Sequence, residues 1–573
     1  MTDDVEQRGG RITLRYDGVG GGSGPLTLGQ DNMIRCIRRD RPEQINQASA
    51  WPVPDGTGVT AALDALRSLV ERHPSLRTAF PDGPGGGFPQ RQEVRTAGEL
   101  TVATVAAGDR TEDELDVLAA ELARTDAAVP LDLAAAPRLR FTLVTDGALL
   151  RRLVVTACHA GVDGAAVTLL VQEWQLLAAG KELPAPASRT PLEVAAQEQS
   201  AQGLRKASAA LKHWETILTT GPSTVFAADG LTGPPDGLAT LLLRSRTAAA
   251  DLLAVSRRTA AGPSAVLLAV FAALTAHRAA RTDLVLSALS ANRRRAALAD
   301  HIGTLAQDAL IALDTAADDL DALIGRAKAA SFTGYWHSTI NADKVWRLLD
   351  DTAERRGARF ARQVVVNDLS LAIPEALSDA RPLATADPEV QWLPDQPLPV
   401  RLMLNILRTS GSLEFVVLAC PQVLDRAGAE RFARAVPAVL AAAADRPLPL
   451  AELAALSGLA PVARTGDWQR IGADWIDLGA VRAVLTGALG PAGRAVGLTR
   501  TGDRLTARLA TTDPALTPAA VHRAVLAALP GRETAMAPHH YAVHLWSAPS
   551  APGRPEPEWP ALPVLAEGSG RVG

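Results

Sequence analysis

The sequence predicts an α/β (α+β) fold built from two lobes in series, followed by a smaller third segment. Strand-like and helix-like stretches alternate from about residue 11 to residue 443, which favours helices interleaved with mainly mixed strands. A polar, proline-rich stretch at 184–191 divides this alternation and reads as a linker. A new set of short strands begins near residue 466. We therefore expect three domains, at 12–182, 183–455 and 466–573.

The first lobe shows both periodicities clearly. Arg11 to Tyr16 alternates as a half-buried strand does, and the stretch 60–73 places apolar side chains at helical spacing. The glycine-rich stretch 18–24 does not complete a dinucleotide-binding fingerprint, so we expect a loop there. The other expected elements are a turn at 82–85, a helix at 111–125, a strand pair at 138–145 and 149–157, and a helix at 165–177.

The second lobe repeats this alternation. Its expected helices are 193–218, 251–260, 264–280 and 428–443. Its expected strands are 241–245, 284–289, 363–366, 402–407 and 413–418. In the third segment we expect two strands, at 497–499 and 504–509, and a helix at 518–529.

Bulk composition excludes several classes of protein. The 573 residues are 47% hydrophobic, enough for large cores, and the net charge of -4 gives no electrostatic footprint for nucleic acid. The three cysteines are far apart, which predicts neither a metal site nor a disulfide framework. The longest apolar run, 265–276, is shorter than the roughly 20 residues of a membrane span, and the N-terminus lacks a signal-peptide core. We expect a cytoplasmic protein that binds no membrane.

One seven-residue run carries the strongest chemical signal. Cys158-His159-Ala160-Gly161-Val162-Asp163-Gly164 follows the expected strand 149–157 and precedes the expected helix 165–177. A histidine at a strand end, an aspartate four residues later and a glycine directly after it suit acyl transfer, with a base held by a turn that a buried acid organises.

Several other motifs occur in an order and at separations that indicate a family. They are Pro25-Leu26-Thr27-Leu28-Gly29-Gln30, Arg72-His73-Pro74-Ser75-Leu76-Arg77-Thr78-Ala79-Phe80, Asn292-Arg293, Ile302-Gly303-Thr304 and Val366-Asn367-Asp368-Leu369-Ser370. With the His159 run, they resemble the condensation domains of nonribosomal peptide synthetases over roughly residues 12–455. That family carries a His-His-x-x-x-Asp-Gly motif.

The resemblance implies two chloramphenicol-acetyltransferase-like lobes in a V, with His159 at the middle of a central tunnel. It implies a free-standing enzyme that forms an amide from an amine and an acyl thioester. The thioester would be carried by an acyl or peptidyl carrier protein in trans, since no carrier motif occurs in the sequence. The chain itself would bind no cofactor and no metal, because the phosphopantetheine belongs to the carrier.

The resemblance and the residues together suggest roles around His159. The second histidine of the family motif is kept as His159, and Cys158 replaces the first. Neighbouring strand residues point to opposite faces, so we expect Cys158 to pack in the core. His159 would take the proton from the amine, or hold the amine and the tetrahedral intermediate by hydrogen bonds. Both roles stay open.

The residues that follow are expected to support this histidine. Asp163 would brace the loop through a buried, bidentate pair with Arg293. Gly164 would let the backbone approach the thioester and offer an N–H to the oxyanion, or simply form a tight turn. By the family motif, Asn367 and Ser370 are candidates for substrate binding. Arg72 and Arg77 are expected to be structural.

The third segment resembles the small C-terminal subdomain of adenylate-forming enzymes. Such subdomains usually end with a lysine that serves adenylation, and Arg554 stands at that position here. The large, ATP-binding subdomain is absent from the sequence. We therefore expect a compact unit without adenylation activity, packed on the second lobe or docking a carrier protein.

Two alternatives to amide formation remain. The replaced first histidine is compatible with a non-catalytic member that recruits partners to an assembly line. An acyltransferase that acts on an alcohol, or that uses a coenzyme A thioester, would also need His159. Retention of His159 favours either enzyme over the non-catalytic protein.

Overall fold

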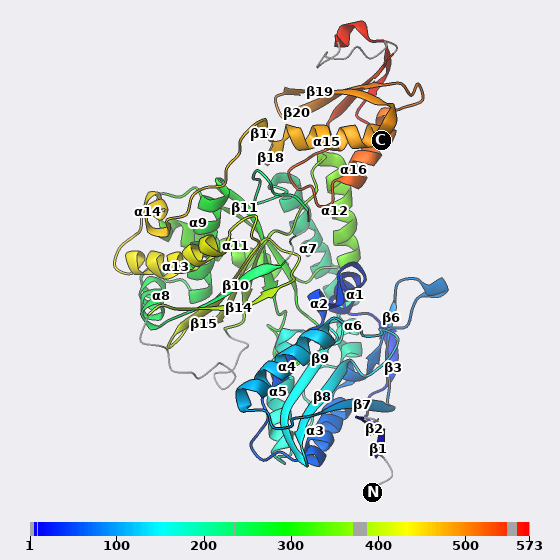
Figure 1. Ribbon diagram of the computed structural model, residues 1–573, viewed down its shortest axis with the longest axis vertical. Coiled ribbons are helices and arrows are strands. Elements are labelled where there is room, and N and C mark those ends of the chain that lie inside the picture. Colours follow the sequence, from blue (N-terminus) through cyan, green and yellow to red (C-terminus); the bar gives the residue numbers. More distant parts are fainter. Residues whose placement is uncertain are drawn as a thin grey trace.

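The computed structural model describes residues 5–8, 10–233, 235, 237–370, 387–546 and 558–571. Figure 1 shows three parts along the long axis: a first lobe (blue to cyan), a second lobe (green to yellow) and a C-terminal part (orange to red). The first two each contain one large mixed sheet with helices, and the third contains a smaller sheet.

The first lobe is built on a six-stranded sheet in the order β1-β2-β7-β8-β9-β4. These strands are β1 (Val5–Arg8), β2 (Arg11–Asp17), β4 (Gln47–Trp51), β7 (Ala97–Ala106), β8 (Leu139–Asp146) and β9 (Leu149–Ala157). Only β7 and β8 pair in parallel among them. Three helices cover the sheet: α3 (Val59–Arg72), α4 (Glu112–Ala127) and α5 (Gly164–Ala178).

Strand β9, between β8 and the edge strand β4, is buried on both faces. Val155 and Ala157 pack in the cluster that α3 and α5 also enter, whereas Val154 packs against α4. A small sheet, β3-β6-β5, flanks the lobe and is formed by β3 (Gly22–Pro25), β5 (Thr78–Ala79) and β6 (Arg91–Val94). The remaining elements are α1 (Leu28–Arg39), α2 (Pro42–Ile45), η1 (Pro74–Arg77) and η2 (Pro84–Gly86).

The second lobe contains a seven-stranded sheet in the order β12-β11-β13-β15-β16-β10-β14. The strands are β10 (Leu238–Ser245), β11 (Asp283–Ser290), β12 (Gln307–Asp314), β13 (Val364–Asp368), β14 (Glu389–Gln396), β15 (Leu402–Arg408) and β16 (Leu413–Ala419). Strand β13 lies between β11 and β15 and pairs in parallel with both.

Strand alternation distributes the helices of this lobe over two faces. Leu284 and Leu286 of β11 pack in the large cluster with α8 (Arg246–Thr259), α9 (Pro263–Ala279), α11 (Leu320–Trp336) and α13 (Arg426–Ala443). Val285, between them, packs in a second cluster with α7 (Ala201–Thr220) and α12 (Ala342–Arg356). The short helices α10 (Ala296–Ala299) and α14 (Leu453–Ser457) complete the lobe, and α6 (Pro191–Glu198) precedes it.

Helix α9 is strongly apolar, and most of its residues are buried in the large cluster. Among the described residues no single helix is long and apolar enough to cross a membrane. The pair α8 and α9 reaches the necessary length only when joined, and the two helices meet at 102°.

The C-terminal part has its own core and its own sheet, β19-β20-β21-β22. Its elements are β17 (Trp468–Ile471), β18 (Asp474–Asp477), α15 (Leu478–Leu489), β19 (Gly493–Thr501), β20 (Arg504–Thr511), α16 (Pro518–Ala528), β21 (His540–Leu545) and β22 (Val564–Gly568). Asp474 attaches it to the second lobe by accepting hydrogen bonds from Ser223 and Arg356 at 2.6–2.8 Å. The part is therefore a compact unit packed on the second lobe, while Arg554 lies outside the described residues.

Most expected elements are present, with differences that have local causes. The expected loop at 18–24 ends in strand β3, because Gly22 to Pro25 pairs with β6 although nothing in its composition favours a strand. The single helix expected at 193–218 is two helices, α6 and α7, since Ser200 caps a new start at Ala201. Helix α6, beyond the expected boundary at 182, lies against β3 of the first lobe.

The C-terminal part, which resembles the small subdomain of adenylate-forming enzymes, should not adenylate any substrate. The large, ATP-binding subdomain of those enzymes does not occur in this sequence. Arg554 also stands where those enzymes have a lysine, and it cannot readily replace that lysine, because arginine spreads its charge over a planar fork whereas lysine has a compact ammonium. Amino-acid-dependent pyrophosphate exchange, measured with the purified chain and a panel of amino acids, should stay at the level of a no-enzyme control. Any exchange above that level would contradict this reading.

Candidate functional site

The seven-residue run forms the connection between β9 and α5. Strand β9 ends at Ala157, and the amides of Gly161 and Val162 fold back to donate to the carbonyl of Cys158. Cys158 is buried in an apolar cluster with Ile34 and Phe80, on the opposite face of the sheet from Ala157. This confirms the packing role expected for Cys158. Its Sγ lies 3.9 Å from a guanidinium nitrogen of Arg138.

His159 is half-buried, directly after this strand end. Its Nδ1 is enclosed and has no hydrogen-bond partner in the described part of the chain. Burial lowers the pKa of His159 below the ordinary histidine value, and it outweighs the opposite effects of Asp163 and of the backbone at His159 and Val162. The imidazole is therefore neutral at neutral pH, which is the state that a general base requires.

Asp163 is completely buried and connects the two lobes. Its Oδ1 accepts from the amide of Ala166 at 3.0 Å and caps α5. Its Oδ2 accepts from Arg293 at 2.8 Å and from the amides of Leu305 and Ala306 at 2.8 and 2.9 Å. Three of its four donors thus come from the second lobe.

These contacts decide the charge of the Asp163 carboxyl. Burial alone would raise its pKa, but Arg293 and the amides of Leu305 and Ala166 more than offset burial and hold the pKa below the ordinary value. The aspartate is therefore ionised, and it forms a compensated ion pair with Arg293 inside the protein.

The expected ion pair between Asp163 and Arg293 is present, but the expected bidentate geometry is wrong. Only Nη1 of Arg293 contacts the carboxylate, while Nη2 donates to the carbonyls of His301 and Gly303 at 3.0 Å. The second oxygen of Asp163 is already used to cap α5, so it is not available to the guanidinium. Arg293 therefore holds the second-lobe loop 291–306 as well as the aspartate.

Asn292 explains why Arg293 can reach the first lobe. Its backbone has φ 54°, a left-handed conformation that asparagine tolerates better than most residues. Its side-chain amide donates to the carbonyls of Leu305 and Ser338, at 3.0 and 3.3 Å. Asn292 thus fixes the turn, and Arg293, the next residue, extends from this turn to bind Asp163.

Gly164 is exposed at the first position of α5. A Cβ at this residue would meet no protein atom within 4 Å, and its φ is not in the left-handed region. The fold therefore does not require glycine here, contrary to the expectation of a tight turn. Within the described residues, the amides of Gly164 and Ala165 have no hydrogen-bond acceptor.

The two substrate-binding candidates lie on the second lobe. Asn367 is on β13 beside Asn405 of β15, and Ser370 donates through its hydroxyl to Asp368 at 2.6 Å. Neither forms a hydrogen bond with the residues of the His159 loop. Arg77 donates to backbone carbonyls of Val70, Arg95 and Val19, which agrees with its expected structural role.

A second set of contacts, not anticipated from the sequence, reinforces the junction. The hydroxyl of Ser75 donates to the carbonyl of Ile302, and Gln307 donates to the carbonyl of Leu28 at 3.3 Å. On the surface Arg35 pairs with Asp343 at 3.1 Å. Ser75 lies inside the Arg-His-Pro-Ser run, so its motif could have drawn attention to it, whereas backbone carbonyls carry no sequence signal.

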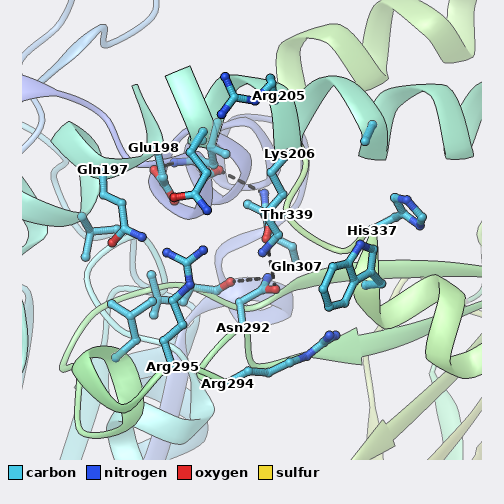
Figure 2. Close-up of a pocket in the computed structure, with 18 residues that line it drawn as sticks. Gln197, Glu198, Arg205, Lys206, Asn292, Arg294, Arg295, Gln307, His337 and Thr339 are labelled. Atoms are coloured by element: carbon cyan, nitrogen blue, oxygen red, sulfur yellow. Dashed lines mark hydrogen bonds between the residues drawn. The ribbon is translucent and has the colours of Figure 1, made fainter. Parts of the chain in front are cut away.

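A cavity of about 610 Å³ adjoins this junction. Asn292 lies in its wall (Figure 2), and so does Leu305, whose carbonyl accepts from Asn292 and whose amide donates to Asp163. His159, Asn367 and Ser370 do not line it. The described residues contain no group of three or more His, Cys, Asp or Glu side chains that could hold a metal ion.

The loop geometry recurs in the second lobe. Cys420 follows β16, donates its amide to the carbonyl of Arg401 at 2.8 Å, and places Sγ 3.5 Å from the same arginine. Cys158 and Arg138 make the matching contacts in the first lobe. Five residues after each cysteine, Asp163 and Asp425 cap the following helix. Pro421 stands where the first lobe has His159, so only the first copy has a histidine at this position.

This repeat supplies a matched control for the role of Asp163. Asp163→Ala should lower the free energy of unfolding by about 3–5 kcal/mol and reduce soluble yield, because Arg293 stays buried without its partner. Asp425→Ala removes only a cap, from the amide of Gly428, and should cost about 0.5–2 kcal/mol. Denaturant unfolding of both variants measures the two losses of stability. Equal losses would contradict the idea that the ion pair of Asp163 with Arg293 clamps the two lobes together.

The comparisons with known proteins agree with this architecture. The condensation-domain family matches residues 40–457. Surfactin synthase subunit 2 of Bacillus subtilis is 26% identical over 284 residues, 49% of this chain and 8% of that protein. The phosphinothricin tripeptide synthetase PhsC of Streptomyces viridochromogenes is 30% identical over 271 residues, 43% of this chain and 23% of that protein. The chain thus spans a small part of the synthetases that it matches.

Solved structures show the same fold at low identity. SgcC5 of Streptomyces globisporus gives a TM-score of 0.56 at 18% identity, covering 74% of this chain and all of SgcC5. The condensation domain of the monacolin K polyketide synthase MokA gives 0.60 at 16%, covering 75% of this chain and 99% of that one. The two lobes are therefore chloramphenicol-acetyltransferase-like, as expected.

A longer match comes from the four-domain nonribosomal peptide synthetase AB3403, with a TM-score of 0.60 at 16% identity over 86% of this chain and 38% of AB3403. The family match alone covers well over half of the residues, and it contains the His159 loop, Asp163 and Arg293. The chain belongs to the condensation-domain family of nonribosomal peptide synthetases.

Proposed function

We propose that this chain joins an amine to a carrier-bound acyl thioester, with His159 as the catalytic residue. The observation that supports this best is the His159 loop itself. A half-buried imidazole, held neutral by burial, precedes a helix whose first two amides have no acceptor in the described protein. A neutral base and unpaired N–H donors within six residues are what acyl transfer needs.

The proposed reaction forms one C–N bond and breaks one C–S bond. The amine attacks the thioester carbonyl, and His159 takes a proton from the nitrogen as the bond forms. When the tetrahedral intermediate collapses, the proton passes to the leaving sulfur, so an amide and a thiol result. In the alternative role, His159 orients the amine and the intermediate by hydrogen bonding without accepting the proton.

The start of α5 is the proposed oxyanion site. The amides of Gly164 and Ala165 add to the positive end of the helix dipole, which favours negative charge. The exposed Gly164 also leaves space in front of them, since no protein atom lies within 4 Å of the place that a Cβ would occupy there. Asp163 keeps these amides in place by capping the helix at Ala166.

We propose that a carrier protein presents the donor in trans, on its phosphopantetheine arm. The family supports a carrier-bound donor, and its members in the curated synthetases are short parts of very long chains, so action in trans is the part of the proposal that needs a test. The assay below therefore supplies the loaded carrier as a separate protein. Product formation under these conditions would support action in trans, and strict dependence on a fused carrier would contradict it.

An alcohol acceptor is a second candidate. A neutral imidazole can deprotonate a hydroxyl as well as an amine, and the SgcC5 structure contains a naphthyl ethanediol. The same assay, run with matched amines and alcohols, separates an amide from an ester by the mass and hydroxylamine stability of the product.

His159→Ala should lower the rate of acyl loss from a loaded carrier by about 10²–10⁴, the usual contribution of a positioned base. The fold should be kept, because the side chain is half-buried and its Nδ1 bonds to nothing in the described protein. Intact-mass spectrometry of the carrier, with candidate amines present, gives the rate.

Cys158→Ala is the matched control for that experiment. It removes a buried side chain at the neighbouring position, so it should keep most of the activity and cost about 1 kcal/mol of stability from a small cavity. An inactive, well-folded Cys158→Ala protein would favour a nucleophilic cysteine, and unchanged turnover of His159→Ala would exclude the proposed base.

The acid limb of kcat/KM should lie below the ordinary histidine pKa of 6.5, because burial lowers the pKa of His159 and activity is lost only when the pH falls through the lowered value. The unfolded chain takes up the proton first, so this group also destabilises the fold as the pH falls below 6.5. Unfolding measured at each pH separates the two effects. Comparing amines of different pKa separates the titration of the acceptor from that of the enzyme, and an acid limb of the enzyme above 6.5 would contradict a desolvated base.

A further inference from the structure

The 610 Å³ cavity beside the junction has an unusual set of charges. Figure 2 shows Arg205 and Lys206 entering from α7 on one side, and Arg294 and Arg295 from the segment after β11 on the other. All four side chains are exposed to solvent. A cavity of this size is typical of sites for small organic ligands.

The cations are not neutralised by the surrounding protein. Within the described ranges, Arg205, Lys206 and Arg295 form no ion pair and donate no side-chain hydrogen bond, and Arg294 donates only to the carbonyl of Tyr335. Basic side chains on protein surfaces are commonly paired with carboxylates, and this chain has many such pairs elsewhere, for example Arg35 with Asp343. Three unpaired cations around one cavity therefore leave a positive field inside it.

The cavity has one acidic residue, Glu198, and it does not cancel this field. Its Oε2 accepts from the amide of Leu28 at 2.8 Å, so it is held against the wall. Burial raises the pKa of Glu198 to about 7, which leaves it only partly ionised at neutral pH. Burial, Arg295 and Arg294 together lower the pKa of Lys206, in agreement with several cations sharing one space.

The rest of the lining can hold the body of a ligand. Trp336 is 58% exposed and offers a flat apolar face, and the side-chain amide of Gln197 offers a polar contact. The cavity also adjoins the catalytic loop, because Leu305 lines it while the amide of Leu305 donates to Asp163. A ligand seated there would lie close to the lobe junction.

We propose that this cavity binds the anionic group of a small organic ligand, a carboxylate or a phosphate, through Arg205, Lys206, Arg294 and Arg295. Arginine forks match both groups in geometry, and the lysine adds a point charge. The role of the ligand rests on the proposed function: a carboxylate would belong to the amine acceptor, and a phosphate to the pantetheine arm of the donor. The anion preference itself does not depend on catalysis.

Calorimetric binding to the purified full chain tests this with two pairs of probes. One pair is a panel of free amino acids against the corresponding amino acid amides, and the other is phosphopantetheine against pantetheine. The variants are Lys206→Met and Arg295→Gln. Lys212→Met is the control, since Lys212 lies on the same helix α7, is exposed and does not line the cavity.

In the native protein, the anionic probe of at least one pair should bind about tenfold more tightly than its neutral partner. Lys206→Met and Arg295→Gln should each reduce that preference, and Lys212→Met should leave it unchanged. The pair that responds identifies the carboxylate or the phosphate. No preference in either pair, or a preference that survives both cavity variants, would overturn the inference.

The experiments distinguish a failure of the proposed reaction from a failure of the proposed anion site. A chain that binds the anion but releases no acyl group from a loaded carrier would refute the reaction and keep the site. A chain that condenses without any preference for the anion would refute the site and keep the reaction.

Discussion

The buried carboxylate of Asp163 is the constraint on which the arrangement depends. A charge in the interior is stable only when it is paired and its remaining lone pairs are satisfied. Asp163 meets this condition with four donors, one from its own helix and three from the second lobe. The first lobe therefore cannot bury this charge by itself. The loop 291–306 of the second lobe has to cross the junction before the loop that carries His159 is complete.

This requirement also explains how chemistry is divided among neighbouring residues. Arg293 uses both of its terminal nitrogens at the junction, where it binds Asp163 and the carbonyls of His301 and Gly303. The next two residues, Arg294 and Arg295, face the cavity instead. Asn292, in its left-handed conformation, directly precedes these three residues. Of these three consecutive arginines, the first thus forms a structural contact and the other two add positive charge to the cavity.

Much of this could be predicted from the sequence, for definite reasons. Strand alternation placed Cys158 and Ala157 on opposite faces, since β9 is long and buried on both sides. The partnership of Asp163 with Arg293 followed from charge and motif, but its geometry did not, because the capping of α5 depends on backbone amides that have no sequence signal. The cavity was missed for a similar reason: Arg205 and Arg295 are far apart in sequence, and each alone looks like an ordinary exposed residue.

The two copies of the internal repeat share their local contacts but differ at the residue after the cysteine and in what their aspartate binds. Both lobes carry an arginine that contacts a cysteine after a strand, and an aspartate that caps the next helix. Only Asp163 also binds the opposite lobe, and only the first copy has a histidine after the cysteine. His159 and the aspartate that binds the second lobe thus occur in the same loop, so the position of His159 depends directly on the contact between the lobes.

A double-mutant cycle of Asp163→Ala and Arg293→Met, measured by denaturant unfolding, tests the clamp most directly. Each single variant leaves one buried group without its partner, whereas the double variant leaves neither, so the two losses should be far from additive, with a coupling of about 1–3 kcal/mol. Additive losses, with a coupling near zero, would show that Asp163 and Arg293 do not hold the lobes together.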